Sequence, residues 1–298
     1  MILKNFLKKM RSRLLSPVLQ TIHYQGIYAD RQPQILLSLA YKRMLHDNVP
    51  LPGFDEIGFS LLSENDEDGI LLYIFSLIGT TNKKLVDIGC SNVNDSNTSN
   101  LLINHGWTGL LIDGDENAIR TGRDYYSNCP NTKLFPPISL CAFITAENIN
   151  QLIGENGFSE TIDLLSIDLD GMDYWVWKAI DSITPRVVVA EYQDIIGPDK
   201  AFTVPYRPDF KKGDYEVNQI RPDYVGASLP AFVKLARHKG YRLVGCNRYG
   251  YNAFFVLSGL GEGCLPEVTA ESCLQHPWNV FGMEERFPRV KDMDWQEV

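Results

Sequence analysis

Acidic side chains stand at the ends of two apolar segments that have the composition of buried strands. Asp168 and Asp170 lie at the end of the segment 162–169, and Glu191 lies at the end of the segment 186–192. Alternate residues of an extended chain point to the same side, so Asp168 and Asp170 can face one site. Carboxylates in such a place can take the proton of a reacting hydroxyl or position a cofactor. We therefore predict Asp168, Asp170 and Glu191 as the catalytic residues.

The same acids offer oxygen atoms that a divalent ion can bind. No histidine lies near them in the sequence, and their spacing matches no diagnostic metal motif. We therefore expect no metal ligand, and we keep a divalent ion only as a minor alternative. Acids at a helix start also offset the helix dipole, and we place Asp173 in the first turn of the next helix.

A turn that follows the segment 84–89 has the position of a cofactor loop. Asp87 and Gly89 end this strand-like segment, and the following residues read CSNVNDSNT. Free N–H groups at the start of the next helix favour a ligand there. Only Gly89 remains of a GxGxG pattern, because Ser91 and Val93 stand where further glycines are usual.

Taken alone, this turn also fits an ordinary capped connection between a strand and a helix. Ser96, Asn97 and Thr98 are all residue types that cap helices. A second acidic turn follows the segment 109–114. Asp113 ends that segment, where a carboxylate can accept both ribose hydroxyls of a nucleoside cofactor, and Asp115 suits the helix N-cap.

The elements that must position these residues alternate between strand and helix. Apolar segments that predict strands span 84–89, 109–114, 139–145, 162–169 and 186–192. Helix-compatible stretches span 98–106, 115–124, 146–154, 172–182 and 228–239. Runs that are apolar at nearly every position are typical of strands buried on both faces, so we predict an α/β domain with a parallel sheet.

Two further strands close this sheet. They span 241–246 and 252–257, and only the five residues 247–251 separate them. A parallel crossover needs a dozen or more residues, so the pair must be an antiparallel hairpin. A mostly parallel seven-stranded sheet with a closing hairpin is the layout of the Rossmann-like methyltransferase fold. Asn252 begins the last strand and is a candidate substrate contact.

The segment 193–227 shows no clear periodicity and holds several aromatic and basic residues. A loop of this length inside a compact domain is usually functional or disordered. It follows the end of a central strand, above the crevice where open α/β sheets bind ligands. We therefore predict a substrate lid, with Tyr206, Arg207 and Arg221 as substrate contacts.

Composition narrows the class of protein further. The chain has 298 residues, 44% of them hydrophobic, and a formal net charge of −9, which is typical of a globular protein and not of a nucleic-acid binder. We divide it into a helical N-terminal extension (1–59), a methyltransferase-like domain (60–260) and a C-terminal tail (261–298). Its six cysteines show no CxxC spacing, so we expect reduced thiols in a cytoplasmic protein.

Residues 1–24 form a basic leader on an acidic chain. They carry +5 and no acidic residue, so the rest of the chain carries −14. The leader contains no apolar run of the ~18 residues needed to span a bilayer. Its apolar residues recur at helical spacing, which fits a helix on an anionic membrane surface. We favour the other interpretation, a helix that packs on the body of the protein or on a second subunit in a homo-oligomer.

Several of these motifs together resemble the FkbM-type branch of the S-adenosylmethionine-dependent methyltransferases. The resemblance covers about residues 60–258. It rests on the strings VDIGCSN, SNT, HGWTGLLIDGDE, FITAENIN, IDLLSIDLDGMDYWVWKAI, PRVVVAEYQ and GYRLVGCNRYGYNAFFV. It implies a Rossmann-like methyltransferase fold, S-adenosylmethionine as cofactor, and O-methylation of a sugar, a glycan precursor or a related hydroxylated metabolite.

The resemblance also implies roles for individual residues. Asp113 would hold the ribose, and Asp168 with Asp170 would face the methyl-transfer site. The segment 67–69 resembles the family's helix start that can contact the methionine end. The implied cofactor-binding residues are Glu67, Asp87, Gly89, Cys90, Ser91, Asn97, Asp113 and Asp168.

One departure from the family keeps alternatives in view. The family loop carries a second glycine, and this chain has Ser91. A degenerate methyltransferase-like protein that serves as a binding or scaffold protein is therefore the main alternative. A nicotinamide-linked enzyme on the same layout is a weaker one, because the chain lacks GxGxxG and its sheet closes with a hairpin.

Overall fold

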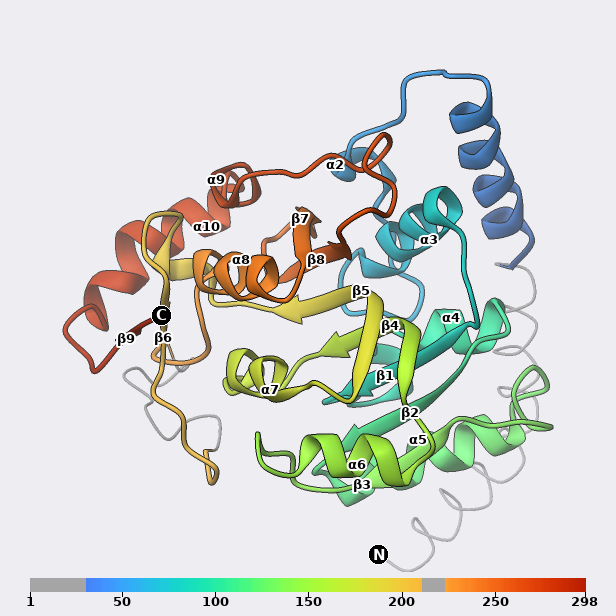
Figure 1. The fold of residues 1–298 in the computed structure, drawn as a ribbon, viewed down its shortest axis with the longest axis horizontal. Helices are drawn as coiled ribbons and strands as arrows, with labels where there is room; N and C mark the ends of the chain where they lie inside the picture. Colours follow the sequence, from blue (N-terminus) through green and yellow to red (C-terminus); the bar gives the residue numbers. More distant parts are fainter. Residues whose placement is uncertain (1–30, 211–222) are drawn as a thin grey trace, which may run out of the picture.

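A seven-stranded sheet forms the centre of the molecule (Figure 1). The structure is a computed structural model, and it describes residues 31–210 and 223–298. The strands are β1 (Lys84–Ile88), β2 (Thr108–Asp113), β3 (Ile138–Cys141), β4 (Glu160–Ile167), β5 (Ile183–Glu191), β7 (Tyr241–Cys246) and β8 (Asn252–Leu257). Their order is β3-β2-β1-β4-β5-β8-β7.

The pairing of the strands confirms the predicted fold class. β1, β2, β3, β4 and β5 pair in parallel, whereas β8 runs antiparallel to both β5 and β7. In the short connection of the hairpin, the Asn247 Oδ1 accepts hydrogen bonds from the backbone N–H groups of Tyr251 and Asn252, at 2.8 and 3.1 Å. The chain therefore has the Rossmann-like methyltransferase fold, an α/β fold with a mostly parallel sheet and a closing hairpin.

Helices cover both faces of the sheet. Their bounds are α2 (Phe54–Ile57), α3 (Glu67–Ile78), α4 (Ser99–Asn104), α5 (Glu116–Asn128), α6 (Ile149–Glu155), α7 (Asp173–Ala179), α8 (Leu229–His238), α9 (Ala270–Cys273) and α10 (Pro277–Phe281). Residues 31–46 are also helical and lie beside α3 and α4 (Figure 1). The Asp115 side chain accepts hydrogen bonds from the backbone of Asn117 and Ala118, which confirms it as the N-cap of α5.

Successive strand residues send their side chains into two different cores, because side chains alternate between the faces of a strand. The core that contains α6, α7 and α8 includes Val86, Ile88, Val188, Val176 and Phe232. The core that contains α3, α4 and α5 includes Leu85, Leu111, Val187, Ile74 and Leu102. The central strands are thus buried on both faces, as their nearly continuous apolar sequences predict.

The segment after β5 packs against the C-terminal part of the chain. β6 (Phe202–Thr203) pairs with β9 (Gln296–Glu297), and a third apolar cluster joins residues such as Ile195, Val204 and Val290. Arg286, within the π-helical turn η3 (Gly282–Arg286), donates to the Asp223 carboxylate at 2.7 and 3.0 Å. Parts of the segment after β5 therefore pack against residues near the C-terminal end of the chain.

Two predictions concern residues outside the described part of the chain. The basic leader 1–24 and the candidate substrate residue Arg221 both belong to that remainder. Within the described ranges, no helix combines the length and the apolar character that crossing a bilayer requires.

Candidate active site

A cavity of about 470 Å³ opens where the carboxyl ends of the central parallel strands meet. In open α/β sheets this edge is the usual place for a ligand. Many of the residues that line it are acidic. They are Glu64, Asn65, Gly89, Ser91, Asp95, Asp113, Asp168, Asp170, Glu191, Tyr251 and Asn252.

The loop after β1 keeps a glycine-like path although one glycine is replaced. Gly89 has a φ of +79°, and a Cβ there would lie 1.7 Å from the carbonyl oxygen of Asp168, so only glycine fits. Ser91 also adopts a left-handed conformation, with a φ of +48°. Its N–H donates to the Asp113 Oδ2 at 2.9 Å. The serine therefore occupies the conformation that a second glycine would supply more readily.

The side chain of Asp87 stabilises this loop through hydrogen bonds. Its carboxylate is buried and accepts hydrogen bonds from the hydroxyls of Ser96 and Thr98, at 3.0 and 2.6 Å. Burial raises the pKa of Asp87 to about 6, although these two hydrogen bonds act in the opposite direction. Thr98 takes the N-cap position of α4, but its side chain caps no helix N–H group. Asp87 is thus placed to shape the loop, and it does not line the cavity.

Asp113, at the end of β2, ties two loops together at the cavity wall. Its Oδ2 accepts from the Ser91 N–H, and its Oδ1 accepts from the Asp115 N–H at 2.7 Å. A carboxylate oxygen can accept two hydrogen bonds. Each oxygen of Asp113 can therefore take a further donor from a ligand in the cavity.

Three carboxylates converge at the ends of β4 and β5. One oxygen from each of Asp168, Asp170 and Glu191 can be chosen so that all three lie within 4.8 Å of one another. Burial raises the pKa of Asp168 well above its ordinary value, and the charges of Asp173 and Asp170 raise it further, while a hydrogen bond with Glu191 lowers it. Like charges at this distance disfavour full ionisation, so the group tends to retain a proton.

Asp173 begins α7, as predicted, and holds the turn that carries these acids. Its carboxylate accepts from the backbone N–H groups of Leu169 and Gly171, at 2.7 and 2.9 Å. Burial raises the pKa of Asp173 to about 6. Asp173 thus fixes the turn between Asp168 and Asp170.

Glu67 positions Asn252 from behind the cavity wall. Glu67 begins α3 and is fully buried, and it accepts hydrogen bonds from the Asn65 N–H and from the side-chain amides of Asn247 and Asn252, at 3.0, 2.7 and 3.0 Å. Asn252 is only 6% exposed. Its Nδ2 faces Glu67, and its Oδ1 is buried and accepts no hydrogen bond from the described residues.

Besides Glu67 and Asp87, four further predicted site residues among those described do not line this cavity. Cys90 and Asn97 are buried, and the Asn97 Nδ2 donates to the Ser166 Oγ at 3.4 Å. The Tyr206 hydroxyl donates to Glu147, and Arg207 lies 3.4 Å from the Asp209 carboxylate. Tyr206 and Arg207 line a separate cavity of about 120 Å³. They reach the candidate site only indirectly, because Gly114 and Leu169, which follow Asp113 and Asp168, line that smaller cavity too.

The structure adds lining residues that the sequence did not single out. Glu64 and Asn65 precede α3, Asp95 lies in the short turn η1 (Val93–Asp95), and Tyr251 ends the hairpin connection. They sit in irregular segments, where no periodic pattern marks a face. In the sequence, the position of Tyr251 next to Asn252 was the feature that could have indicated that it lines the cavity.

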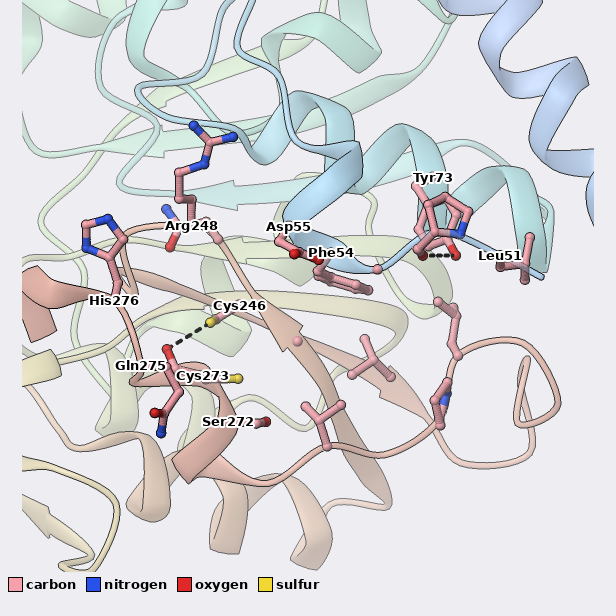
Figure 2. A pocket seen from close by; sticks show the side chains of 18 of the residues that line it. Leu51, Phe54, Asp55, Tyr73, Cys246, Arg248, Ser272, Cys273, Gln275 and His276 are labelled. Carbon is pink, nitrogen blue, oxygen red and sulfur yellow. Dashed lines mark hydrogen bonds between the residues drawn. The ribbon is translucent and has the colours of Figure 1, made fainter.

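A larger cavity, of about 670 Å³, lies between α2, β7 and the segment 264–276 (Figure 2). Its walls carry apolar side chains together with cysteines, and the Cys246 thiol donates to the Cys273 carbonyl oxygen. No residue lines both this cavity and the acidic one. We place the candidate active site in the smaller cavity, because the carboxyl ends of the parallel strands and the converging carboxylates meet there.

Solved structures resemble this chain distantly. No family model matches the sequence, and no curated protein matches it. TnmH has 13% identity and a TM-score of 0.38 over 59% of this chain, which spans half (50%) of TnmH. An S-adenosylmethionine-dependent methyltransferase from Methanosarcina mazei has 12% identity and a TM-score of 0.32, with 58% of this chain and 90% of that chain covered.

The mitomycin 7-O-methyltransferase MmcR is a further neighbour, with 13% identity and a TM-score of 0.36 over 80% of this chain and 71% of that chain. Methyltransferases thus recur among the similar structures. The likeness is too distant to carry an argument about activity. The fold assignment rests on the strand order of this chain.

Proposed function

We propose that this protein is an enzyme that transfers a methyl group from S-adenosylmethionine to a hydroxyl group. One observation carries the proposal: a single acidic cavity at the carboxyl ends of the parallel strands joins the Gly89 loop, Asp113 and the carboxylates of Asp168, Asp170 and Glu191. These are the places where the resemblance to FkbM-type methyltransferases puts the cofactor loop, the ribose contact and the reaction.

The residues present fit this cofactor in size and in polarity. Small-molecule pockets commonly hold about 300–1,000 Å³, and this cavity holds about 470 Å³. The Asp113 oxygens can accept hydroxyl donors, and the Asn252 Oδ1 offers an unused acceptor. Acidic walls also favour a cationic ligand. Gly89, Ser91 and Asp113 would hold the nucleoside part, and Asp168 would face the charged end.

When bound, S-adenosylmethionine supplies a methyl group on a positively charged sulfur, and the carbon–sulfur bond breaks as the carbon–oxygen bond forms. The chain contributes placement and proton acceptance. Asp170 and Glu191 line the cavity and can take the hydroxyl proton on a carboxylate oxygen. Correct placement of the two reacting groups supplies the rest of the catalysis.

We propose a sugar, a glycan precursor or a related hydroxylated metabolite as the acceptor. The support is the family resemblance and the aromatic and polar residues near the site. Tyr206 and Arg207 line the smaller cavity that adjoins the loops after β2 and β4. A polyhydroxylated acceptor that reaches from one cavity to the other would contact both sets of residues.

Calorimetric titration of the full chain with S-adenosylmethionine and S-adenosylhomocysteine tests the proposal. We expect saturable binding of both. Gly89→Ala should abolish it, because the new Cβ would meet the Asp168 carbonyl. Gly106→Ala is the matched control: Gly106 also has a positive φ, of +69°, but no atom lies within 4 Å of the added Cβ.

If neither ligand binds at millimolar concentration, the enzyme proposal fails. The chain is then better described as a degenerate methyltransferase-like protein with a binding or scaffold role. The replacement of a loop glycine by Ser91 is the feature that keeps this second candidate in view.

A further inference from the structure

The cavity of about 670 Å³ between α2, β7 and the segment 264–276 has an apolar interior (Figure 2). Tyr73, Val244 and Leu265 line it, and all three are buried members of the core that contains α3. Phe54 lines it as well and packs against the same core. The interior of this cavity is therefore continuous with the hydrophobic core.

A glycine in β7 fixes the aromatic wall of this cavity. An added Cβ at Gly245 would lie 2.5 Å from the Cδ1 of Phe54, so the Phe54 ring packs directly on the backbone there. The same ring lies edge-on to Tyr73 and Phe254, with ring centroids 6.2 and 6.1 Å away. The pairing of β7 with β8 also shifts register between Leu243 and Gly245, as a β-bulge does. The position of Phe54 is thus fixed by its packing before any ligand arrives.

The polar groups of the interior are already engaged within the protein. The Tyr73 hydroxyl donates to the Pro52 carbonyl oxygen at 2.9 Å. The Cys246 thiol donates to the Cys273 carbonyl oxygen at 3.2 Å. The Asn247 side chain is hydrogen-bonded through both its nitrogen and its oxygen. A polar ligand would therefore lose its hydrogen bonds to water and find few partners inside.

Charged side chains stand at the mouth of this cavity, and they carry both signs. Asp55 and Arg248 line the cavity and are exposed. Figure 2 shows the Arg248 guanidinium directed away from Cys246 and Cys273. The mouth therefore selects neither anions nor cations, and the interior favours an uncharged molecule.

Sulfur atoms and aromatic rings favour an aromatic ligand in this interior. Cys246, Cys264 and Cys273 all line the cavity as free thiols. Sulfur is polarisable and makes favourable contacts with aromatic rings, and rings such as those of Phe54 and Tyr73 attract other rings edge-on or offset. The volume lies within the range of about 300–1,000 Å³ that is common for small-molecule pockets. We propose that this cavity binds a small, uncharged aromatic molecule.

This site is separate from the proposed methyl-transfer site. No residue lines both cavities. S-adenosylmethionine carries a positive charge and many polar groups, so the apolar interior should exclude it. The aromatic ligand should bind whether or not the cofactor does, and the two proposals can fail independently.

Fluorescence titration of the full chain with N-phenyl-1-naphthylamine, an uncharged aromatic probe, tests the site. We expect saturable binding of one probe per chain. Indole should displace the probe, and 1-hexanol, an aliphatic molecule of comparable hydrophobicity, should need a severalfold higher concentration, because aromatic contacts add to the gain from buried area. S-adenosylmethionine should not displace it.

Two tryptophan substitutions on α9 distinguish this cavity from the surface around it. Ser272 and Glu271 are both exposed, and of the two only Ser272 lines the cavity. In Ser272→Trp the indole ring would take up part of the cavity. Probe binding should weaken roughly tenfold or more, since even one methylene group in an apolar pocket is worth about 10–200-fold. Glu271→Trp is the matched control and should bind the probe as the unmodified chain does.

Maleimide labelling followed by mass spectrometry locates the probe without any substitution. Bound probe should slow the modification of Cys246 and Cys264, because both line the cavity. Modification of the exposed Cys141, which does not line it, should be unchanged.

The proposal is overturned if no saturable binding occurs, or if the two tryptophan variants bind the probe equally well. Labelling of Cys246 and Cys264 that the probe does not slow overturns it too. Displacement by S-adenosylmethionine would place the probe in the acidic cavity, and stronger displacement by 1-hexanol than by indole would refute the aromatic class. Absence of cofactor binding in the same samples removes the proposed function and leaves this site standing.

Discussion

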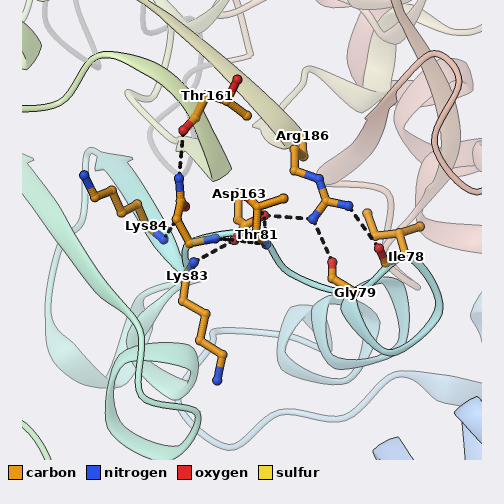
Figure 3. Close-up of polar contacts among 9 residues, drawn as sticks. Ile78, Gly79, Thr81, Lys83, Lys84, Thr161, Asp163 and Arg186 are labelled. Atoms are coloured by element: carbon orange, nitrogen blue, oxygen red, sulfur yellow. Dashed lines mark hydrogen bonds and ion pairs between the residues drawn. The ribbon is translucent and has the colours of Figure 1, made fainter.

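β4 carries a carboxylate near its amino end, and further carboxylates stand at the carboxyl ends of β4 and β5, where the surroundings differ sharply. Near the amino ends, Asp163 is fully buried and accepts from Arg186 and from the backbone of residues 81–83, at 2.7–2.9 Å (Figure 3). Near the carboxyl ends, Asp168 faces Asp170 and Glu191 around a cavity. The Asp163 carboxylate accepts hydrogen bonds from several donors, whereas the Asp168 carboxylate lies close to other acids.

The pKa values of these two acids move in opposite directions. Burial raises the pKa of Asp163, but Arg186 and the backbone donors outweigh it, so the net pKa lies below the ordinary value. For Asp168, burial and nearby carboxylates combine to raise the pKa. The comparison indicates that Asp163 serves the fold, whereas the cluster at the other end costs stability, which is typical of functional sites.

The largest effect on stability is expected at Asp163, near the amino end of β4. Asp163→Asn should lower the free energy of unfolding by about 3–5 kcal/mol, because it leaves the buried Arg186 without its counter-charge. Urea unfolding measures this loss. Glu267→Gln is the control, since it breaks an exposed pair with Arg237 and should cost at most about 1 kcal/mol. Equal losses in the two variants would remove the distinction between the ends.

The stability of the protein should depend on pH through Asp87. Burial raises the pKa of this carboxyl group from 3.8 to about 6 in the folded protein. Between these values the folded state holds a proton that the unfolded chain has released. Stability is therefore greatest below the lower value and falls as pH rises through this window. The loss amounts to roughly 2–3 kcal/mol.

Asp87→Asn should remove this pH dependence. The variant should gain stability relative to the unmodified chain as pH rises from about 4 to about 7, by roughly 2–3 kcal/mol. Urea unfolding at several pH values measures the difference between the two proteins. A difference in stability that stays constant with pH would show that folding does not raise the pKa of Asp87.

A substitution at Asp113 tests whether the carboxyl ends of the strands bind the cofactor. Asp113→Ala should weaken S-adenosylmethionine binding by about 1–3 kcal/mol through lost charged hydrogen bonds. Asp115→Asn is the control, because asparagine caps a helix as well as aspartate does. Calorimetry of both variants decides the matter. Unchanged affinity in a folded Asp113→Ala variant would refute the ribose assignment.

The smallest expected effect is a gain in stability, and it concerns Asp168. Asp168→Asn removes one charge from the crowded end, so the free energy of unfolding should rise by about 1 kcal/mol as repulsion is relieved. The same substitution type destabilises the chain at Asp163. Urea unfolding of the two amide variants side by side measures this reversal. A loss of stability in Asp168→Asn would indicate that its carboxylate is held favourably.

Sequence patterns predicted much of the fold and part of the candidate site. The strands 241–246 and 252–257 were predicted with their observed bounds, because they are short apolar segments that only five residues separate. Asp113, Asp168 and Glu191 were found because they terminate apolar strands. The pair Tyr206 and Arg207 shows the limit, since a long aperiodic segment carries no local signal of which cavity its side chains line.

By itself, the sequence determined the alternation of strands and helices, the closing hairpin and the acidic strand ends, since these follow from local periodicity and chain length. Only the tertiary structure decided which acids meet. Asn252 lies opposite Glu191 through strand pairing, and its side-chain nitrogen donates to Glu67 at the start of α3. Such contacts join residues up to 185 positions apart, and no local pattern encodes them.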